Sequence, residues 1–181
     1  MIFEYISLMF GIMKVLVYKV FYISRISFTG IPKMNHNFKI AIKKNSKLIV
    51  GKNFRTRNDV SIRVYDKGIV HIGESVFFND NCSVNCKKNI DIGNNVIFGQ
   101  NVMLFDHDHD YKNDINNFIK DDIKIGNNVW IGANCIILKG VHIGNNVVIA
   151  AGTIVKEDIA DSSVVYQKRE TTIKSIERKE E

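Results

Sequence analysis

Length, composition and charge set the first bounds on this chain. Its 181 residues fit one domain of ordinary size, which can bury a core without disulfides or a metal ion. The three cysteines, Cys82, Cys86 and Cys135, form neither a CxxC pair nor a regular framework, so a reducing compartment and a cytoplasmic location are expected. The formal net charge of +6 suits an anionic partner, but lysine is common throughout the chain, and we expect no nucleic acid partner.

The first 25 residues are strongly apolar, yet they fit neither a membrane span nor a signal peptide, because charged residues interrupt them and no small-residue cleavage site follows. Their polar positions recur three, four or seven residues apart, which predicts a helix with a narrow polar stripe. These positions are Glu4, Ser7, Gly11, Lys14, Tyr18 and Arg25. The apolar remainder must be covered, either by the protein itself or a sister subunit, or by the interface of a membrane at the inner face of the cell.

From residue 48 onward, apolar residues recur with a period of six. The series is Val50, Ile62, Ile72, Phe78, Val84, Ile92, Phe98, Leu104, Ile125, Ile131, Ile137, Ile143, Ile149 and Val155, with Thr56 as the polar exception. Three places after these positions stand residues that tolerate positive φ: Asn53, Asp59, Asn81, Asn95, Asn101, Asn128, Asn134, Gly140, Asn146 and Gly152. Short parallel strands with a bend every six residues form a triangular solenoid, and we expect about five coils.

Three steps in the series are longer than six, by 4 residues after Ile62, by 2 after Val84 and by 15 after Leu104. Each follows the third strand of its coil, so all three excursions should leave the same corner and stack along one edge. The largest, residues 105–124, begins with the sequence FDHDHDY. A long polar loop in a strict repeat is more often functional than accidental, so this loop is the candidate catalytic segment.

Residues 123–155, IKIGNNVWIGANCIILKGVHIGNNVVIAAGTIV, resemble the hexapeptide-repeat acyltransferases, above all the galactoside and maltose O-acetyltransferases and the O-acetyltransferases of capsule and lipopolysaccharide synthesis. The resemblance covers residues 48 to about 158. It implies an all-β, left-handed parallel β-helix that forms homotrimers and moves an acetyl group from acetyl-CoA to a saccharide hydroxyl in surface polysaccharide biosynthesis, without a metal. At the C-terminus, VYQKRETTI replaces the family's GNPAK type of turn.

Three segments are therefore expected: an apolar helical segment over residues 1–30, the β-helix domain over 31–158, and a charged basic tail over 159–181. Two other functions stay open. In the first alternative, the chain is a catalytically silent β-helix that serves as an assembly module. In the second, it is a metal-dependent enzyme resembling the carbonic anhydrases of the same fold.

The resemblance assigns the catalytic base to His107, with His109 in reserve. Neutral imidazole suits proton removal from a hydroxyl near pH 7, and one carboxylate on the other ring nitrogen would fix the tautomer. Several carboxylates would keep the ring protonated, so only one aspartate of the loop should touch the base, with Asp106 as the candidate. Under a zinc hypothesis, a third ligand such as His71 would have to join the pair, and in a third interpretation the loop is only a solvated acidic segment.

Three asparagines are candidates for binding the saccharide acceptor, because their amides can form hydrogen bonds with sugar hydroxyls, although asparagine is also common in turns. They are Asn79, Asn81 and Asn85. The resemblance implies a donor site from the last coils, walled by Trp130. Its other candidates are Ala133, Ala151 and Thr153, with Lys156, Lys168 and Arg169 for the phosphates of coenzyme A or, alternatively, as ordinary basic surface.

Overall fold

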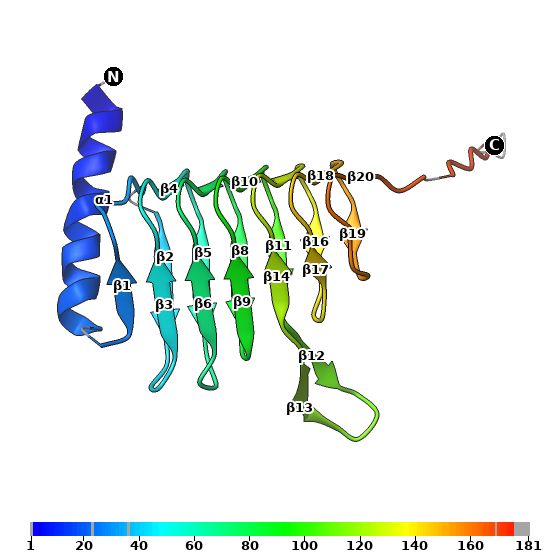
Figure 1. Cartoon of the computed structure of the whole chain (residues 1–181), viewed down its shortest axis with the longest axis horizontal. Coiled ribbons are helices and arrows are strands. Elements are labelled where there is room, and N and C mark those ends of the chain that lie inside the picture. The colour runs from blue at the N-terminus through cyan, green and yellow to red at the C-terminus, as the bar shows by residue number, and fades with distance from the viewer. Residues whose placement is uncertain (1, 23, 36, 169, 176–181) are drawn as a thin grey trace, which may run out of the picture.

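A three-sided parallel β-solenoid carries one helix at its N-terminal end (Figure 1). The computed structural model describes residues 2–22, 24–35, 37–168 and 170–175. The helix α1 spans Ile2–Phe21, within the predicted helical segment. One sheet (sheet A) contains β1 (Ile26–Phe28), β3 (Lys47–Val50), β6 (Ile69–Ile72), β9 (Asn89–Ile92), β14 (Ile123–Ile125) and β17 (His142–Ile143).

The other two walls of the solenoid are built in the same way. Sheet B contains β4 (Arg55–Thr56), β7 (Phe77–Phe78), β10 (Ile97–Phe98), β15 (Trp130–Ile131), β18 (Val148–Ile149) and β20 (Val164–Val165). Sheet C contains β2 (Lys39–Ile42), β5 (Ser61–Val64), β8 (Ser83–Cys86), β11 (Met103–Phe105), β16 (Ile136–Ile137) and β19 (Ile154–Val155). Each sheet has six strands, so the solenoid has about six coils rather than the expected five.

The additional coil lies at the N-terminal end, where β1 and β2 precede the repeat that begins at residue 48. Its inward residues Phe28, Met34 and Ile40 keep the six-residue spacing and are buried. Three places after Phe28 stands Ile31, which does not favour positive φ, whereas Asn37 follows Met34, so this coil carries the corner signal at only one of its two six-residue corners. At the other end, β20 continues the ladder past residue 158 by pairing with β18.

The inward positions of the repeat form the core, as predicted. Every aliphatic or aromatic residue of the series is at most 4% exposed, and Thr56 is 8% exposed. Four phenylalanines, Phe38, Phe54, Phe78 and Phe98, follow one another through successive coils, with ring centroids 6.1, 6.0 and 4.2 Å apart. All ten predicted corner residues have positive φ, which confirms the bends that close each triangle.

The three excursions leave the solenoid at the corner between sheets C and A, as predicted (Figure 1). They are the β5–β6 turn, the β8–β9 turn and the segment between β11 and β14. That segment is more ordered than a loop, because β12 (His107–Asp110) and β13 (Asp114–Lys120) pair as an antiparallel hairpin that projects from the prism.

Helix α1 packs against the first coil through its polar stripe. Gly11 is buried so close to the Met34 carbonyl that a Cβ on residue 11 would collide with that oxygen. The Lys14 Nζ atom donates to the Phe38 carbonyl over 3.4 Å, and the Tyr18 hydroxyl accepts the Ile40 N–H over 3.3 Å. Among the described residues, no helix combines the length and apolarity that crossing a bilayer requires.

Candidate active site

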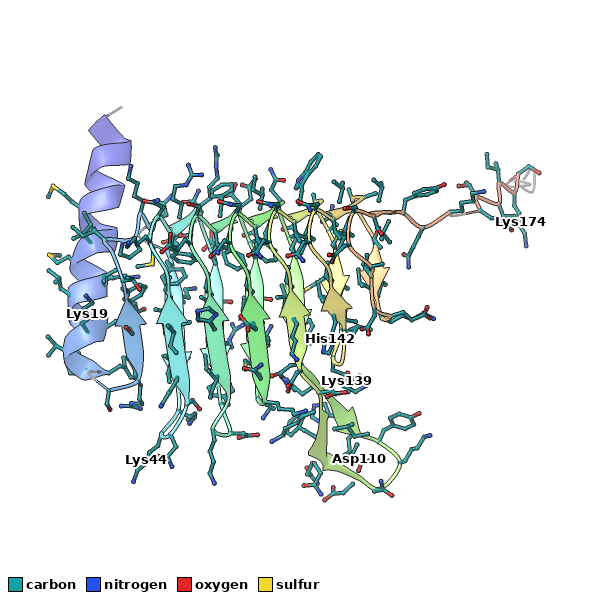
Figure 2. The ribbon with its side chains drawn as sticks, viewed as in Figure 1. Lys19, Lys44, Asp110, Lys139, His142 and Lys174 are labelled. Atoms are coloured by element: carbon teal, nitrogen blue, oxygen red, sulfur yellow. The ribbon has the colours of Figure 1, made fainter. Side chains whose placement is uncertain are left out.

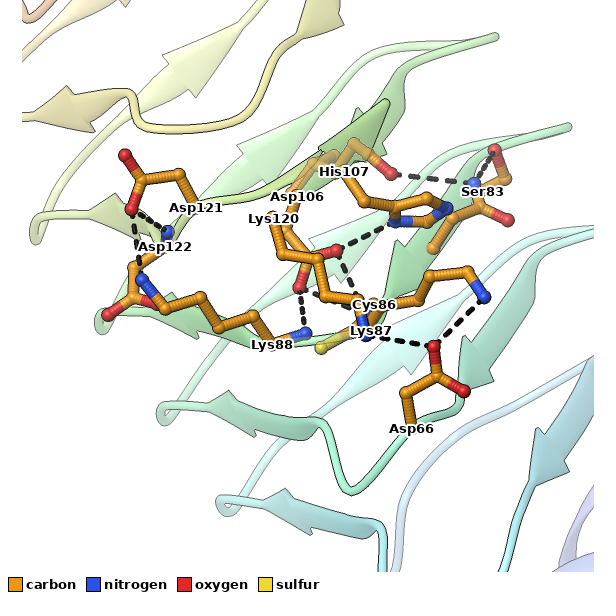
Figure 3. A network of polar contacts seen from close by, with 12 residues as sticks. Asp66, Ser83, Cys86, Lys87, Lys88, Asp106, His107, Lys120, Asp121 and Asp122 are labelled. Carbon is orange, nitrogen blue, oxygen red and sulfur yellow. Dashed lines mark hydrogen bonds and ion pairs between the residues drawn. The ribbon is translucent and has the colours of Figure 1, made fainter. Parts of the chain in front are cut away.

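Asp106 anchors the hairpin to the solenoid at the point where β11 ends (Figure 3). Its side chain is fully buried. The Lys87 N–H donates to both carboxylate oxygens, over 2.8 and 3.0 Å, and the Lys88 N–H donates to one of them over 2.7 Å. A buried carboxylate needs donors, and here the backbone of the β8–β9 turn supplies them. The β8–β9 turn, which is two residues longer than the six-residue step, therefore forms the binding site for the Asp106 carboxylate.

His107 is held by the same carboxylate. Its Nδ1 atom lies 2.8 Å from Asp106 Oδ1, and its side chain is 16% exposed. Because an ionised carboxylate can only accept, this network assigns the proton to Nδ1 and makes Nε2 the acceptor nitrogen. The Phe118 ring packs edge-on against the imidazole, with centroids 5.4 Å apart. The ring therefore has one tautomer and a restricted orientation, which is what a general base requires.

The other polar residues of FDHDHDY bond elsewhere. His109 Nδ1 lies 2.6 Å from the Ile115 carbonyl oxygen, so this imidazole is tied into the hairpin itself. Asp108 forms an ion pair with Lys139 over 3.4 Å, and Asp110 accepts hydrogen bonds from Asn113. Of the three aspartates, Asp106 is the one that bonds His107.

Ion pairs across the three excursions hold the hairpin in place (Figure 3). The Asp66 carboxylate, in the β5–β6 turn, lies 3.2 Å from Lys87 Nζ and 3.0 Å from Lys120 Nζ. The hydrogen bond from Lys120 is the main reason why the pKa of Asp66 is lowered. Lys88 pairs on the other side with Asp121 and Asp122, over 3.0 and 3.1 Å. The excursions thus stack at one edge of the solenoid, and these ion pairs connect them.

The cysteines lie inside the solenoid, as predicted for Cys82 and Cys135, and all three thiols are free. Burial raises the pKa of Cys82 to about 11. Burial, and then the charge of Asp106, raise the pKa of Cys86 well above the ordinary thiol value. The thiols are therefore protonated near neutral pH and act as core residues rather than nucleophiles.

The predicted acceptor residues separate into two places. Asn85, on β8, stands in register with Phe105 of β11, close to the corner from which the hairpin leaves. Its amide donates to Ser83 Oγ over 3.2 Å and accepts from Arg63 over 3.3 Å. Asn79 and Asn81 lie in the turn before β8, at the opposite end of that strand, and Asn81 is a corner residue with φ of 60°. Only Asn85 shares the corner of His107.

The predicted donor residues gather at the corner between sheets B and C. Ala133 and Ala151 lie on successive coils there, since the Gly152 N–H donates to the Ala133 carbonyl over 2.7 Å. Trp130, on β15, is 55% exposed. The Thr153 side chain is buried and its hydroxyl donates to the Ala150 carbonyl over 2.7 Å, so that hydroxyl already serves the turn.

The charged donor candidates lie farther along the chain. Lys156 and Lys168 are exposed beyond β19 and β20, whereas Arg169 lies outside the described residues. The Gln167 amide, within the departing VYQKRETTI segment, bonds the backbone N–H and carbonyl of Ile154 over 3.2 and 3.0 Å. This side chain closes the edge of β19 at the end of the solenoid.

Sequence reasoning missed the residues that position His107. Lys87 and Lys88 act through backbone N–H groups, and Phe118 packs against the imidazole ring from β13. The two-residue excursion after Val84 was the available signal, but it did not reveal what the turn holds. The proposed third zinc ligand, His71, bonds Asp91 over 2.8 Å on sheet A. Within the described ranges, no three His, Cys, Asp or Glu side chains converge as a metal site.

Comparisons with known proteins agree with this architecture. Residues 122–157 match the family described as bacterial transferase hexapeptide (six repeats). The galactoside O-acetyltransferase of Escherichia coli is 34% identical over 141 residues, which cover 73% of this chain and 68% of the relative. A putative lipopolysaccharide biosynthesis O-acetyl transferase of the same organism, WbbJ, is 24% identical over 71% of each chain.

A solved structure extends the likeness to three dimensions. A galactoside acetyltransferase in complex with coenzyme A is 26% identical, with a TM-score of 0.56 over 83% of this chain and 63% of that chain. For two further curated acetyltransferases, the match spans about half of the relative's length, 48% and 56%. The solenoid is the left-handed parallel β-helix of these proteins. With the coil repeat, the fold and the Escherichia coli relative in agreement, the chain belongs to the hexapeptide-repeat acetyltransferase family.

Proposed function

We propose that this protein is an acetyl-CoA-dependent O-acetyltransferase that acts on a saccharide hydroxyl, with His107 as the general base. The observation that carries the proposal is the bond from His107 Nδ1 to the buried Asp106 carboxylate, 2.8 Å long. It leaves Nε2 to accept a proton on the side of the ring away from Asp106. Two relatives support the reaction class by their names, a galactoside O-acetyltransferase and a putative lipopolysaccharide biosynthesis O-acetyl transferase.

In the proposed reaction, His107 Nε2 removes the proton of the acceptor hydroxyl while the hydroxyl oxygen attacks the thioester carbonyl carbon. The resulting tetrahedral oxyanion collapses, the carbon–sulfur bond breaks, and the thiolate of coenzyme A takes the proton back from the imidazolium. The products are an acetyl ester and free coenzyme A. Asp106 is a positioning residue, because it holds the tautomer and stabilises the imidazolium without itself accepting the proton.

The proposed donor is acetyl-CoA, and support comes from the related acetyltransferase solved with coenzyme A. We assign its pantetheine arm to the corner of Ala133 and Ala151, beside the exposed face of Trp130. Small side chains at a corner allow close approach to backbone donors and acceptors, and the exposed Lys156 and Lys168 supply positive charge for phosphates. Arg169 stays a candidate for the same role.

We further propose that the enzyme works as a homotrimer. The donor corner joins sheets B and C, whereas His107 stands at the corner between C and A, so the two lie at opposite ends of the sheet C strands. A neighbouring chain that brings its donor corner against this His107 would complete the site. Light scattering should then give about 62 kDa, three times the chain mass of 20.7 kDa. A fully active monomer would contradict this part of the proposal.

The acceptor that we favour belongs to a surface polysaccharide, and the likeness to a putative lipopolysaccharide biosynthesis O-acetyl transferase supports it. Asn85 lies at the corner of the base, where both amide hydrogens are used by Ser83 and Leu104 and Oδ1 accepts from Arg63, so its second Oδ1 lone pair is the group that we assign to a sugar hydroxyl. Deleting the gene and measuring ester-linked acetate in the surface polysaccharide tests the biological role. An unchanged acetate content would direct the search to soluble sugars.

The activity itself is tested by release of free thiol from acetyl-CoA with a panel of sugars. We expect release with at least one sugar, its loss in His107→Ala, and no effect of a chelator. Thiol release that depends on the sugar but disappears with chelator would favour the metal hypothesis. An inert wild-type protein across the panel would favour the silent assembly module.

A further inference from the structure

Helix α1 turns its polar stripe toward the solenoid and its apolar side toward solvent. Gly11 and Val15 are buried and Tyr18 is half-buried against the first coil. Six large apolar side chains are exposed instead, between 48 and 73%: Met9, Met13, Leu16, Val17, Val20 and Phe21. Their spacing of four, three, one, three and one residues places them on a single helix face, which we call the outer face of α1. An apolar stripe of this size calls for a partner.

The charge around this face is unusually one-sided. Residues 5–58, which include most of α1 and the first coil, contain eleven of the 25 Lys and Arg residues and none of the 19 Asp and Glu residues. Their formal charge is +11, so the remainder of the chain carries −5. The net charge of +6 is thus the sum of a basic N-terminal segment and an acidic remainder. A charge distribution of this kind orients a protein near a charged surface.

A basic recess lies where α1 ends and the β2–β3 turn approaches. It is lined by Ser24, Arg25 and residues 44–47, and two of those are Lys44 and Lys47. The Ser46 hydroxyl in its lining is fully buried and has no hydrogen-bond partner among the described residues. The Arg25 guanidinium is held nearby by the Tyr22 ring, 4.8 Å away, and by the Ile42 carbonyl. This set of donors would bind an anionic oxygen, which accepts their hydrogen bonds.

We propose that the outer face of α1 and the basic N-terminal coil dock the protein on an anionic phospholipid membrane. Apolar side chains would enter the interface, Lys19 at the border of the face would extend toward the headgroups, and Lys44 and Lys47 would meet lipid phosphates. Figure 2 shows Lys19 and Lys44 at the helix end of the solenoid, whereas Asp110, in the hairpin, lies farther along it. The candidate active site therefore stays clear of the docked end.

Charge argues against a second copy of the chain as the partner of this face. Pairing two outer faces would bring two segments of formal charge +11 together, and like charges in contact oppose association. An anionic bilayer supplies the opposite charge as well as an apolar phase. The proposal is independent of the acetyl transfer reaction, because none of its residues belongs to the candidate active site.

The test is co-sedimentation of the full chain with vesicles of phosphatidylcholine, with or without phosphatidylglycerol. We expect binding to the anionic vesicles that weakens with salt, and little binding to neutral ones. Val20→Ser/Phe21→Ser should lower partitioning at least tenfold, since each side chain loses apolar burial. Lys44→Gln/Lys47→Gln should lower it roughly 30-fold at low salt, from about fivefold per charge.

Matched controls come from the other end of the molecule. Val164→Ser/Ile173→Ser removes side chains of 69 and 90% exposure, and Lys124→Gln/Lys174→Gln removes two exposed charges. Both should bind like the wild type, and circular dichroism should show all four variants folded. The proposal is overturned if the wild type ignores anionic vesicles, if the controls weaken binding equally, or if phosphate ions bind the recess without any vesicle binding. It is also overturned if Val20→Ser/Phe21→Ser changes the oligomeric mass but not vesicle binding, because the face would then join copies of the chain.

Discussion

The solenoid core and the β12–β13 hairpin are held together by different forces. In the core, Phe54, Phe78 and Phe98 are fully buried in successive coils, with Phe54 edge-on to Phe78 and Phe78 stacked on Phe98. The hairpin is largely exposed, and charged or backbone contacts through Asp106 and Asp66 hold it to the prism. Burial of apolar side chains contributes strongly to stability and depends little on their exact orientation, whereas hydrogen bonds fix the orientation of the groups that they join. Stability and the proposed chemistry therefore depend on separable parts of one chain.

Replacing His107 should separate the two parts most clearly. With His107→Ala we expect kcat to fall by roughly two to four powers of ten, the usual contribution of a positioned general base. The affinity for acetyl-CoA and the midpoint of thermal unfolding should stay near their wild-type values, because the imidazole belongs to no core cluster. Steady-state kinetics and a thermal melt measure the two effects on the same preparation.

His109→Ala is the matched control, since this imidazole bonds only within the hairpin in the described structure. Its effect should be far smaller. Equal damage from both replacements, together with loss of bound metal, would instead support the zinc hypothesis.

Phe98→Ala should give the opposite result. The ring stacks on Phe78 with centroids 4.2 Å apart and planes 3° apart, and its removal leaves a cavity in a closely packed core. We expect unfolding to become easier by about 3–5 kcal/mol in denaturant melts, with kcat per folded molecule little changed. Phe77→Ala, on the outward side of β7, is the control and should cost much less. A core variant that lost catalysis while keeping full stability would contradict the separation of stability from catalysis.

The same contrast explains what the sequence could predict. Each six-residue step repeats one piece of local information, an inward apolar residue and a corner residue, so fourteen aligned positions specify the solenoid redundantly. The first coil was not predicted because Ile31 stands where a corner residue was expected, although Phe28, Met34 and Ile40 keep the spacing. Periodicity detects such a coil only when both signals coincide.

Features that depend on contacts between distant segments were beyond such reasoning. His107 and Asp106 are neighbours in the chain, and their pairing could be anticipated. The backbone donors of Lys87 and Lys88 could not, because no side-chain pattern marks a free N–H group. The helix stripe was visible in the sequence, but the side that faces the solenoid is decided by close packing at Gly11, which only the structure reveals.

Asp106→Asn should produce a smaller loss than His107→Ala and should act through the same imidazole. An amide has one accepting oxygen and two donor hydrogens, so it cannot satisfy both backbone N–H groups and the Nδ1 proton as the carboxylate does. We expect kcat to fall about hundredfold and stability to fall by about 1–3 kcal/mol from unsatisfied polar groups. Kinetics of the single variants and of the double variant measure the coupling.

The double variant with His107→Ala distinguishes positioning from a merely structural role. If Asp106 acts through His107, the double variant should be no slower than His107→Ala alone, because the base that Asp106 orients is already absent. Additive losses in kcat would mean that Asp106 contributes to the rate by another route.

The smallest expected effect concerns the ion pairs that clamp the hairpin. The hydrogen bond from Lys120 lowers the pKa of Asp66 below its model-compound value of 3.8, so the pair stabilises the fold when pH is above that value. This stabilisation should be lost as pH falls through the lower pKa of the folded state. Because the Asp66 side chain is 42% exposed, solvent screening limits the contribution to less than about 1 kcal/mol. Asp66→Asn should therefore lower the thermal midpoint slightly at pH 7, and the difference from wild type should vanish well below pH 4 and shrink in high salt. A difference that persisted in acid would show that Asp66 holds the hairpin by shape rather than by charge.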